Sequence, residues 1–247
     1  MRQTHRSGEY RDPWHPIPAN LRIAPFPRHL NDTMRQLPLL TLVLATAAII
    51  VHLLGQPFQS AMEYDRAAVA AGQFCRLVTC QWVHWSADHL FWDVCVFLAI
   101  GSACEVRDRR RAIAVTLLST IGVPVAIHFL SPAITNFRGL SGIDSALFGL
   151  ALVLVAEEGV RQRRWSMLAA GVAGVSLFIA KCTYELMTSK TLFVESSDFV
   201  VVPLAHVVGL AVGLGVAALI RLIRWRSKRI RVTSSSDWLG CRPSAAA

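Results

Sequence analysis

Six long apolar stretches, separated by polar and basic segments, dominate the pattern of the sequence. They lie at about 37–56, 88–105, 112–131, 140–157, 165–182 and 199–220. A helix that crosses a bilayer needs about 17–25 mostly apolar residues, so the pattern predicts an all-α polytopic membrane protein. Its six-transmembrane-helix bundle is predicted to occupy 37–225, between an arginine- and proline-rich tail at 1–36 and a second tail at 226–247. Pro124 is expected to kink the third helix.

The basic residues predict how these helices are oriented. If the N-terminus is cytoplasmic, the cytoplasmic segments hold twenty Lys and Arg residues and the external segments hold five. Cytoplasmic segments of membrane proteins carry an excess of Lys and Arg, so both termini are predicted to lie in the cytoplasm. The segment 57–87 is then external, and its amphipathic part EYDRAAVAAG could lie along the membrane surface.

Composition narrows the class of protein further. With 53% hydrophobic residues and a mean hydropathy of +0.44, the chain is too apolar for an ordinary soluble domain. A net charge of +9 could suggest a nucleic-acid partner, but the basic residues lie between apolar stretches rather than among aromatic residues. We therefore expect the lipid bilayer as the surroundings of the chain and no nucleic acid as a partner.

Ionisable residues inside the apolar stretches are the first candidates for function. Each costs about 2.5–3.5 kcal/mol at the centre of a bilayer on insertion scales, so few are kept without a role. The chain has five of them, and a serine that could act as a nucleophile lies nearby: His89, Asp93, His128, Asp144, His206 and Ser141.

Three of these polar positions fall at one predicted depth. Depth can be counted at about 1.5 Å per helical residue from the charged residues of the following cytoplasmic segment. Asp93 lies about 21 Å from the next arginine and His206 about 22 Å, while Ser141 lies about 30 Å from Arg161 but about 24 Å from Glu157. All three helices are predicted to run from outside to inside, so the three residues share a layer in the outer half of the membrane.

The chemistry of this layer is that of a serine nucleophile and a histidine base. A neutral imidazole can take the proton of a serine hydroxyl, so Ser141 and His206 could form a dyad. Gly139 and Gly142 let the chain turn beside the serine. Backbone N–H groups there and the side chain of His89 could donate hydrogen bonds to an oxyanion, at about 2.7–4 kcal/mol per donor in known cases.

The same residues also fit simple packing. Ser141, Ser145 and Gly149 are spaced by four residues, as are Gly209 and Gly213, and such stripes of small residues let membrane helices pack closely. The glycine pair would also let the sixth helix approach the fourth and carry His206 with it. His128, alone in its helix, is expected to be a hydrogen-bonded packing residue.

The cysteines and histidines give no sign of a metal or cofactor. Cys75 and Cys80, in the predicted external loop, could form a disulfide or remain free thiols. Neither CxxC nor HExxH occurs in the sequence, so we expect no metal and no cofactor.

Five stretches of the chain resemble the motifs of one protein family. They are GQFCRLVT (72–79), HWSADHLFWD (84–93), GSACEVR (101–107), GLSGIDSALFG (139–149) and AHVVGLAVG (205–213). In that order they are similar to an external element ending in WRLlT, to HxxxxHxxxN, to Glu-x-Arg, to GxSGxxxAlxG and to the histidine motif of a sixth helix. These are the motifs of the rhomboid intramembrane serine proteases, and the resemblance spans roughly 37–225.

The resemblance implies a fold, an activity and roles for individual residues. It implies a six-helix core in a bacterial plasma membrane, and a serine-type endopeptidase that cuts transmembrane protein substrates near the external end of their membrane segment. Ser141 takes the position of the nucleophile and His206 that of the general base, without a third acid. His84 and His89 fall on the two histidines of the second-helix motif, where His89 would stabilise the oxyanion. HLFWD is also similar to the HLxWN of the rhombosortase-like subgroup, which trims C-terminal membrane anchors.

Three residues depart from the family pattern. Asp93 stands in place of an Asn that donates to the oxyanion, so its carboxyl group would have to be protonated or turned to orient His89. Ser145 replaces a Tyr that stacks on the base in many members, so His206 would be held differently, and Cys75 replaces a Trp. Asp144 takes no role from the family; it could border a cavity or hydrogen-bond a loop.

Two other functions remain open from the sequence. The first is a catalytically weak or inactive rhomboid-like protein that binds transmembrane helices, which Asp93 favours and the Ser141/His206 pair opposes. The second is a membrane haem protein with His89 and His206 as ligands, which would leave the serine motif unexplained. The sequence indicates neither the substrate nor the oligomeric state.

Overall fold

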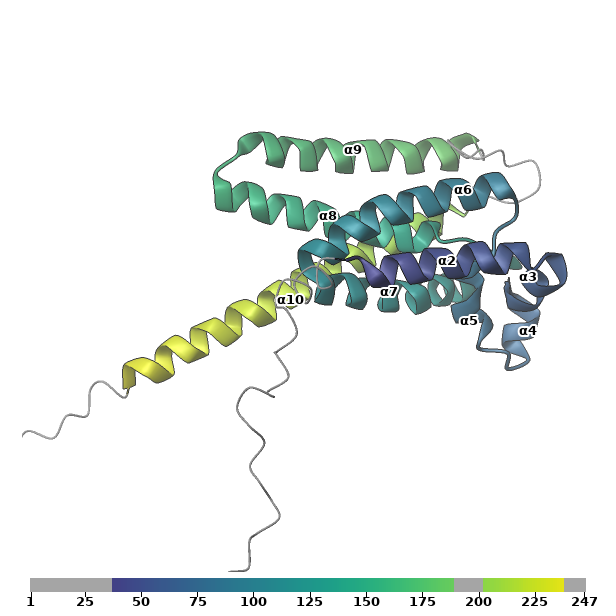
Figure 1. Ribbon diagram of the computed structural model, residues 1–247, viewed down its shortest axis with the longest axis horizontal. Helices are drawn as coiled ribbons and strands as arrows, with labels where there is room; N and C mark the ends of the chain where they lie inside the picture. The colour runs from purple at the N-terminus through teal and green to yellow at the C-terminus, as the bar shows by residue number, and fades with distance from the viewer. Residues whose placement is uncertain (1–36, 189–201, 238–247) are drawn as a thin grey trace, which may run out of the picture. The chain divides into compact units, whose positions relative to one another are not determined.

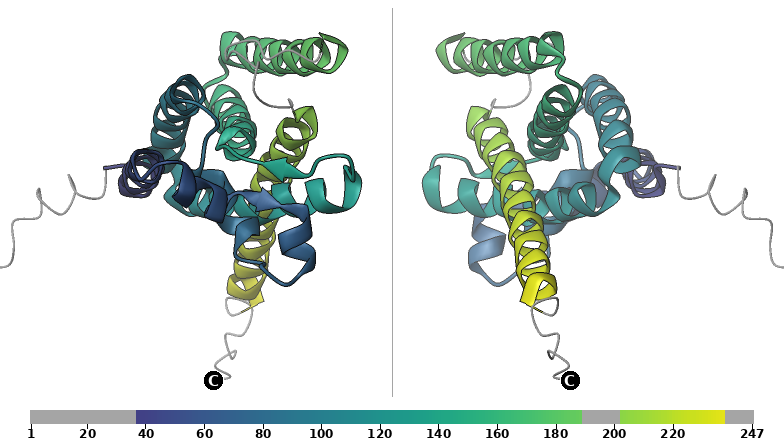
Figure 2. Two further views of the ribbon diagram at one scale, coloured as in Figure 1. Left: turned by 90° about the vertical axis from the view of Figure 1, so that its right-hand side faces the viewer. Right: turned by 90° about the vertical axis from the view of Figure 1, so that its left-hand side faces the viewer.

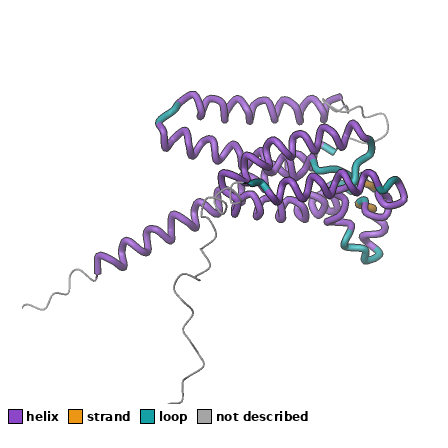
Figure 3. Tube along the Cα trace, viewed as in Figure 1, coloured by secondary structure: helices purple, strands orange, loops and turns teal. Residues whose placement is uncertain are grey.

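The computed structural model describes residues 37–188 and 202–237, and these are almost entirely helical (Figure 1). The longer helices are α2 (Leu39–Leu53), α6 (Ala87–Val96), α7 (Ser102–Leu130), α8 (Ser141–Gln162), α9 (Trp165–Thr188) and α10 (Pro203–Asp237). Short elements join them: α3 (Gln56–Met62), β1 (Tyr64–Asp65), α4 (Arg66–Ala70), α5 (Arg76–Thr79), the 3₁₀ turn η2 (Cys80–Trp82), the π-helical turn η3 (Phe97–Gly101) and β2 (Asn136–Phe137) (Figure 3). The all-α class is therefore confirmed, and each predicted apolar stretch carries a helix.

The predicted ends of the chain fall largely beyond this region. The tail 1–36 lies outside the described residues, as does the start of the sixth apolar stretch. Helix α10 continues to Asp237, past the end of the bundle predicted at residue 225.

Three helices of the described region are long and apolar enough to cross a membrane. They are Ala87–Leu130, Trp165–Thr188 and Pro203–Arg224. Helix α2 is shorter, with 15 residues, and α8 carries Asp144 in its first turn and Glu157 and Glu158 near its end. Length and composition thus show a membrane protein, and the count of six spans stays a prediction.

The second and third apolar stretches form one helical run with a break at Asp108. There the backbone leaves helical geometry, with φ −148° and ψ 82°, whereas Pro124 lies inside the continuing helix. The Asp108 carboxylate accepts the backbone N–H of Arg111 at 3.2 Å, as an aspartate does when it caps a new helix. The same carboxylate binds Arg224 of α10 at 2.7 Å, so the turn between the two halves is tied to the last helix.

Helix α8 is the centre of the packing (Figure 2). It contacts α7, α9, α10 and the π-helical turn η3, and Figure 2, which looks along the helices, shows it surrounded by its neighbours. Its side chains Ile143, Leu147 and Leu150 are fully buried. A helix that carries a candidate nucleophile at its first residue is therefore also the most constrained element of the bundle.

Glycines bring α10 into backbone contact with α8. A Cβ atom on Gly209 would overlap the carbonyl oxygen of Gly142, and one on Gly213 would overlap that of Ala146. The predicted approach of the two helices through small residues is confirmed. Because positions 209 and 213 meet positions 142 and 146 in the same order, the helices run parallel, with the start of α10 beside the start of α8.

A buried glutamate fixes the N-terminal helix to the bundle. Glu105, in the GSACEVR segment, accepts the backbone N–H groups of Leu40 and Thr41 at 3.0 and 2.8 Å and the Thr41 hydroxyl at 2.9 Å. These N–H groups belong to the first turn of α2 and have no partner within that helix. Two residues on, Arg107 forms an ion pair with Glu158 of α8 at 2.8 Å. The segment therefore joins α2, α7 and α8.

The segment between α2 and α6 packs against the loop that leads to Ser141. Strand β1 pairs antiparallel with β2, with Tyr64 opposite Phe137. The guanidinium of Arg66 donates to four carbonyl oxygens at 127–134, three of which belong to the end of α7 and the residue after it. The Tyr64 hydroxyl lies 3.0 Å from Nδ1 of His128, which confirms that this histidine is a hydrogen-bonded packing residue. Cys75 and Cys80 are free thiols.

Substitution of Gly213 tests the contact between α8 and α10. Gly213→Ala should lower the free energy of unfolding by about 1–3 kcal/mol, because the new Cβ forces the two backbones apart. Gly215→Ala is the matched control, since nothing lies within 4 Å of its added Cβ, and its stability should equal or exceed that of the wild type. Denaturant titration in detergent micelles measures both, and an equal loss in both variants would contradict the packing described here.

Candidate active site

Ser141 is the first residue of α8 and is half-buried. The N–H groups of the first turn of a helix lack partners within it, so those at Ser141 and Gly142 are available to an acceptor beside the serine. The preceding Gly139 has φ +120°, a conformation that residues with a side chain rarely adopt. Its N–H donates to the Cys80 carbonyl at 3.1 Å, which holds the turn against the segment between α2 and α6.

The turn at Gly139 lies directly against two polar residues of α6. A Cβ on Gly139 would lie 2.9 Å from Nε2 of His89 and 3.0 Å from Oδ2 of Asp93. His89 and Asp93 are four residues apart and so face the same side of α6. The Ser86 hydroxyl caps this helix by accepting the N–H of His89 at 3.1 Å. The absence of a side chain at position 139 is therefore what lets α6 and the serine turn meet.

Asp93 is the centre of a buried polar cluster. Its Oδ2 accepts the N–H of Leu140 at 2.9 Å and lies 3.3 Å from Nε2 of both His84 and His89. All three side chains of the cluster are buried, and the two imidazole rings are edge to face at 5.1 Å. Burial lowers the pKa of His84 more than the contact with Asp93 raises it, which favours a neutral ring.

The cluster shows how the aspartate is used at this position. An oxygen that accepts an N–H needs no proton of its own, so the geometry fits a carboxylate that orients the histidines and the residue before Ser141. This fits the second of the two alternatives raised by the sequence for Asp93, a carboxyl group turned to orient His89, and its ionisation stays a prediction. His84, the first histidine of the second-helix motif, is in direct contact with this carboxylate.

His206 lies in the first turn of α10 and is 9% exposed. It precedes Gly209 by three residues, and Gly209 touches Gly142, so His206 is level with the turn that leads into Ser141. Ser145, one turn after Ser141, donates its hydroxyl to the Ser141 carbonyl oxygen at 2.8 Å. Its hydroxyl is therefore engaged within α8.

A residue that the sequence analysis missed lies beside His206. Oε2 of Glu185, on α9, is 3.1 Å from Nδ1 of His206, and Glu185 is only 2% exposed. Lys181 of the same helix lies 2.8 and 2.9 Å from the two carboxylate oxygens. The predicted fifth span ended at residue 182, which left Glu185 in a loop. A Lys and a Glu four residues apart were the available signal that the helix continues.

Asp144 is buried, with 6% of its surface exposed, and its Oδ1 has no hydrogen-bond partner among the described residues. Nothing in the structure assigns this atom a role. The described residues hold no group of three or more His, Cys, Asp or Glu side chains that could bind a metal ion.

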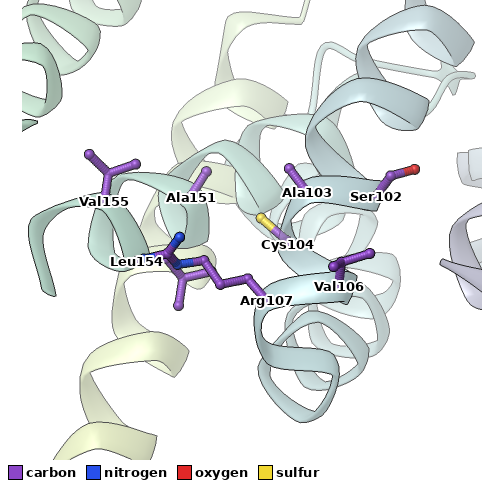
Figure 4. A pocket seen from close by; sticks show the side chains of 8 residues that line it. All are labelled: Ser102, Ala103, Cys104, Val106, Arg107, Ala151, Leu154 and Val155. Atoms are coloured by element: carbon purple, nitrogen blue, oxygen red, sulfur yellow. The ribbon is translucent and has the colours of Figure 1, made fainter. Parts of the chain in front are cut away.

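A pocket of about 580 Å³ lies between the start of α7 and the middle of α8 (Figure 4). Its walls are Ser102, Ala103, Cys104, Val106, Arg107, Ala151, Leu154 and Val155. Ala151 follows Ser141 by ten residues, about 15 Å along the helix, so the pocket is separate from the polar layer. Its lining is mostly apolar, and it contains neither a described histidine nor a carboxylate.

Two of the three described glycines with positive φ test the contact at Gly139. Gly139→Ala and Gly72→Ala both force alanine into a strained backbone, with φ +120° and +97°. Only at Gly139 does the new Cβ also meet His89 and Asp93, whereas nothing lies within 4 Å at Gly72. Thermal unfolding should therefore show a clearly larger loss of stability for Gly139→Ala, and equal losses would refute a tight contact between α6 and the turn.

Comparison with known proteins places the chain in a family. No curated protein matches the chain. The family model of the Rhomboid domain matches residues 71–223, which is more than half of the chain and includes the second-helix cluster, Ser141 and His206. The matched region also holds the contact of α8 with α10 described above. The chain therefore belongs to the rhomboid family.

Proposed function

We propose that this rhomboid-family protein is an intramembrane serine endopeptidase that cleaves transmembrane segments of membrane proteins. Ser141 is the nucleophile, and His206 is the general base and then the general acid. The single observation that supports this most is the parallel contact of α10 with α8, in which Gly209 meets Gly142. Such a contact brings a histidine and a serine from two helices to one end of the bundle.

The proposed reaction follows the chemistry of an activated serine. His206 takes the proton of the Ser141 hydroxyl as the oxygen attacks the scissile carbonyl, and the resulting imidazolium gives that proton to the leaving amine. A water molecule, activated by the same histidine, then hydrolyses the acyl-enzyme. Water and substrate reach Ser141 from the external side, because Ser141 begins a helix that runs inward.

The oxyanion needs hydrogen-bond donors near Ser141. The N–H groups of Ser141 and Gly142 at the start of α8 are the nearest backbone donors, and the helix dipole adds to their effect. His89 is proposed as a side-chain donor. Asp93, which contacts Nε2 of His89 at 3.3 Å and accepts the Leu140 N–H, acts on the oxyanion site through these groups.

One observation favours a second candidate function, an inactive rhomboid-like protein that binds transmembrane helices. Asp93 is an acceptor in the buried cluster, and a carboxylate near an oxyanion would repel it. Cleavage of a transmembrane reporter by the wild type and by Ser141→Ala separates this function from the protease.

The proposal also includes the number of membrane spans and the side of the membrane on which the termini lie. Six membrane spans with both termini in the cytoplasm of a bacterium would bring the layer of Ser141 and His206 toward the external face. Trimming of C-terminal membrane anchors, as in the rhombosortase-like subgroup, is the narrower form of the activity. A reporter with a single C-terminal anchor would reveal it.

Ser141→Ala should abolish cleavage of a transmembrane reporter in liposomes, since no other hydroxyl replaces the nucleophile. Ser176→Ala is the matched control, because Ser176 is an exposed serine of α9 whose hydroxyl donates to the Val172 carbonyl oxygen of its own helix. The readout is the reporter fragment, separated by electrophoresis, together with labelling of the wild type by a serine-reactive fluorophosphonate. Undiminished cleavage in Ser141→Ala would exclude the proposed nucleophile. No cleavage by the wild type, with the reporter helix still bound, would establish the inactive function.

Asp93→Asn should retain or raise the rate of cleavage. The Asn carbonyl can still accept the Leu140 N–H, while its NH₂ group adds a donor in place of a negative charge. Asp88→Asn provides the same exchange at an exposed position of the first turn of α6 and should leave the rate unchanged. A large loss of kcat in Asp93→Asn alone would mean that the carboxylate has a function that an amide cannot supply.

A further inference from the structure

In the buried contact between α9 and α10, a charged side chain of α9, Glu185, faces the proposed base, His206. Glu185 is the one buried residue of α9, and most of the apolar side chains along this helix are exposed or half-exposed. Its carboxylate lies 3.1 Å from Nδ1 of His206. At its deepest point, α9 thus presents a carboxylate to the base rather than an apolar side chain.

Glu185 is held in place independently of His206. Lys181 binds both carboxylate oxygens at 2.8 and 2.9 Å from one turn earlier on α9. A buried carboxylate without a partner costs several kcal/mol, and the ammonium of Lys181 offsets part of that cost. The carboxylate is therefore kept ionised and fixed in direction beside the imidazole.

The inventory of donors and acceptors determines which ring nitrogen carries the proton. Lys181 has only donors, and its Nζ is 3.4 Å from Nδ1, farther than the carboxylate oxygen of Glu185. Glu185, when ionised, has only acceptors, so its short contact with Nδ1 requires a proton on that nitrogen. A neutral imidazole with the proton on Nδ1 has its lone pair on Nε2, which is the form a general base needs.

We propose that Glu185 is a positioning residue for His206, which makes the proposed dyad a Ser141–His206–Glu185 arrangement with the acid supplied by α9. The carboxylate selects the tautomer with a free Nε2, fixes the plane of the ring and stabilises the imidazolium that forms when Nε2 takes the Ser141 proton. Glu185 stays ionised throughout, and the proton leaves from Nε2 to the amine. This role rests on the proposed protease function.

The arrangement accounts for the way His206 is held. The hydroxyl of Ser145, on the face of α8 below Ser141, is bonded to the Ser141 carbonyl oxygen. Within the described residues, the His206 ring makes polar contacts with Glu185 and Lys181 of α9. Displacement of α9 would remove the acid and leave the base without its orienting partner.

Steady-state cleavage of a transmembrane reporter by the full-length protein in liposomes tests the proposal. Glu185→Gln should lower kcat by at least about tenfold with KM within about twofold, because positioning acts on the chemical step. Glu185→Asp should recover part of kcat, since it restores a carboxylate. The matched control is Glu157→Gln, the same exchange in an ion pair with Arg111 at the far end of α8, and its kcat should stay near that of the wild type. Equal kcat in Glu185→Gln and the wild type would overturn the proposal.

A double variant separates positioning from simple neutralisation of Lys181. If Glu185 only cancels the charge of Lys181, then Lys181→Met combined with Glu185→Gln should restore the wild-type kcat. We expect kcat to stay low, because the ring still lacks its acceptor. Full restoration would overturn the role in positioning.

A spectroscopic readout does not depend on activity. In ¹⁵N-histidine spectra of the full-length protein in micelles, His206, assigned with His206→Ala, should show a protonated Nδ1 and an unprotonated Nε2 in the wild type and in Ser141→Ala. Glu185→Leu should change this state. An unprotonated Nδ1 in the wild type would overturn the proposal even if the protein cleaves substrate. Absence of cleavage by the wild type, with the Nδ1 proton present, would overturn the protease function and with it the effect of Glu185 on cleavage, although the contact with His206 would stand.

Discussion

The close contact between the backbones of α8 and α10 is the constraint on which the candidate site depends. In a membrane, apolar surface gains little by leaving lipid for another helix, so association relies on close packing and polar contacts. Gly209 and Gly213 permit an approach that no residue with a Cβ would allow. The helix that carries Ser141 and the helix that carries His206 are thereby held in one register, and their separation cannot adjust to larger side chains.

Four buried or half-buried charged side chains each join two parts of the chain. Glu105 binds the first turn of α2, Arg66 binds the end of α7, Asp93 binds the turn before Ser141, and Glu185 binds the histidine of α10. Each removes a charge from water and recovers part of the cost through hydrogen bonds that only one arrangement of the helices provides. The polar layer is therefore a set of specific connections, with Asp93 on one side of the serine turn and Glu185 on the other side of the base.

Much of this could be predicted from residue patterns, and the misses have physical causes. The apolar stretches, the approach of α10 through Gly209 and Gly213, and the hydrogen-bonded His128 are present as expected. Glu185 was missed because hydropathy falls at the charged pair, whereas the helix continues to Thr188 since Lys181 and Glu185 neutralise each other. The break in α7 at Asp108 lies in the polar segment between the second and third apolar stretches, as expected, whereas the backbone does not leave helical geometry at Pro124, where a kink was predicted.

The sequence by itself determined the class of the protein, the order of its helices and the small residues through which two of them meet, because hydropathy and residue spacing act over one or two turns of helix. Only the tertiary structure decided which polar atoms face one another. Asp93 accepts the N–H of Leu140, which is 47 residues away in the sequence, and Glu185 of α9 contacts His206 of α10. Such contacts depend on the rotation and separation of whole helices. These follow from packing throughout the bundle and are not determined by any local segment of the sequence.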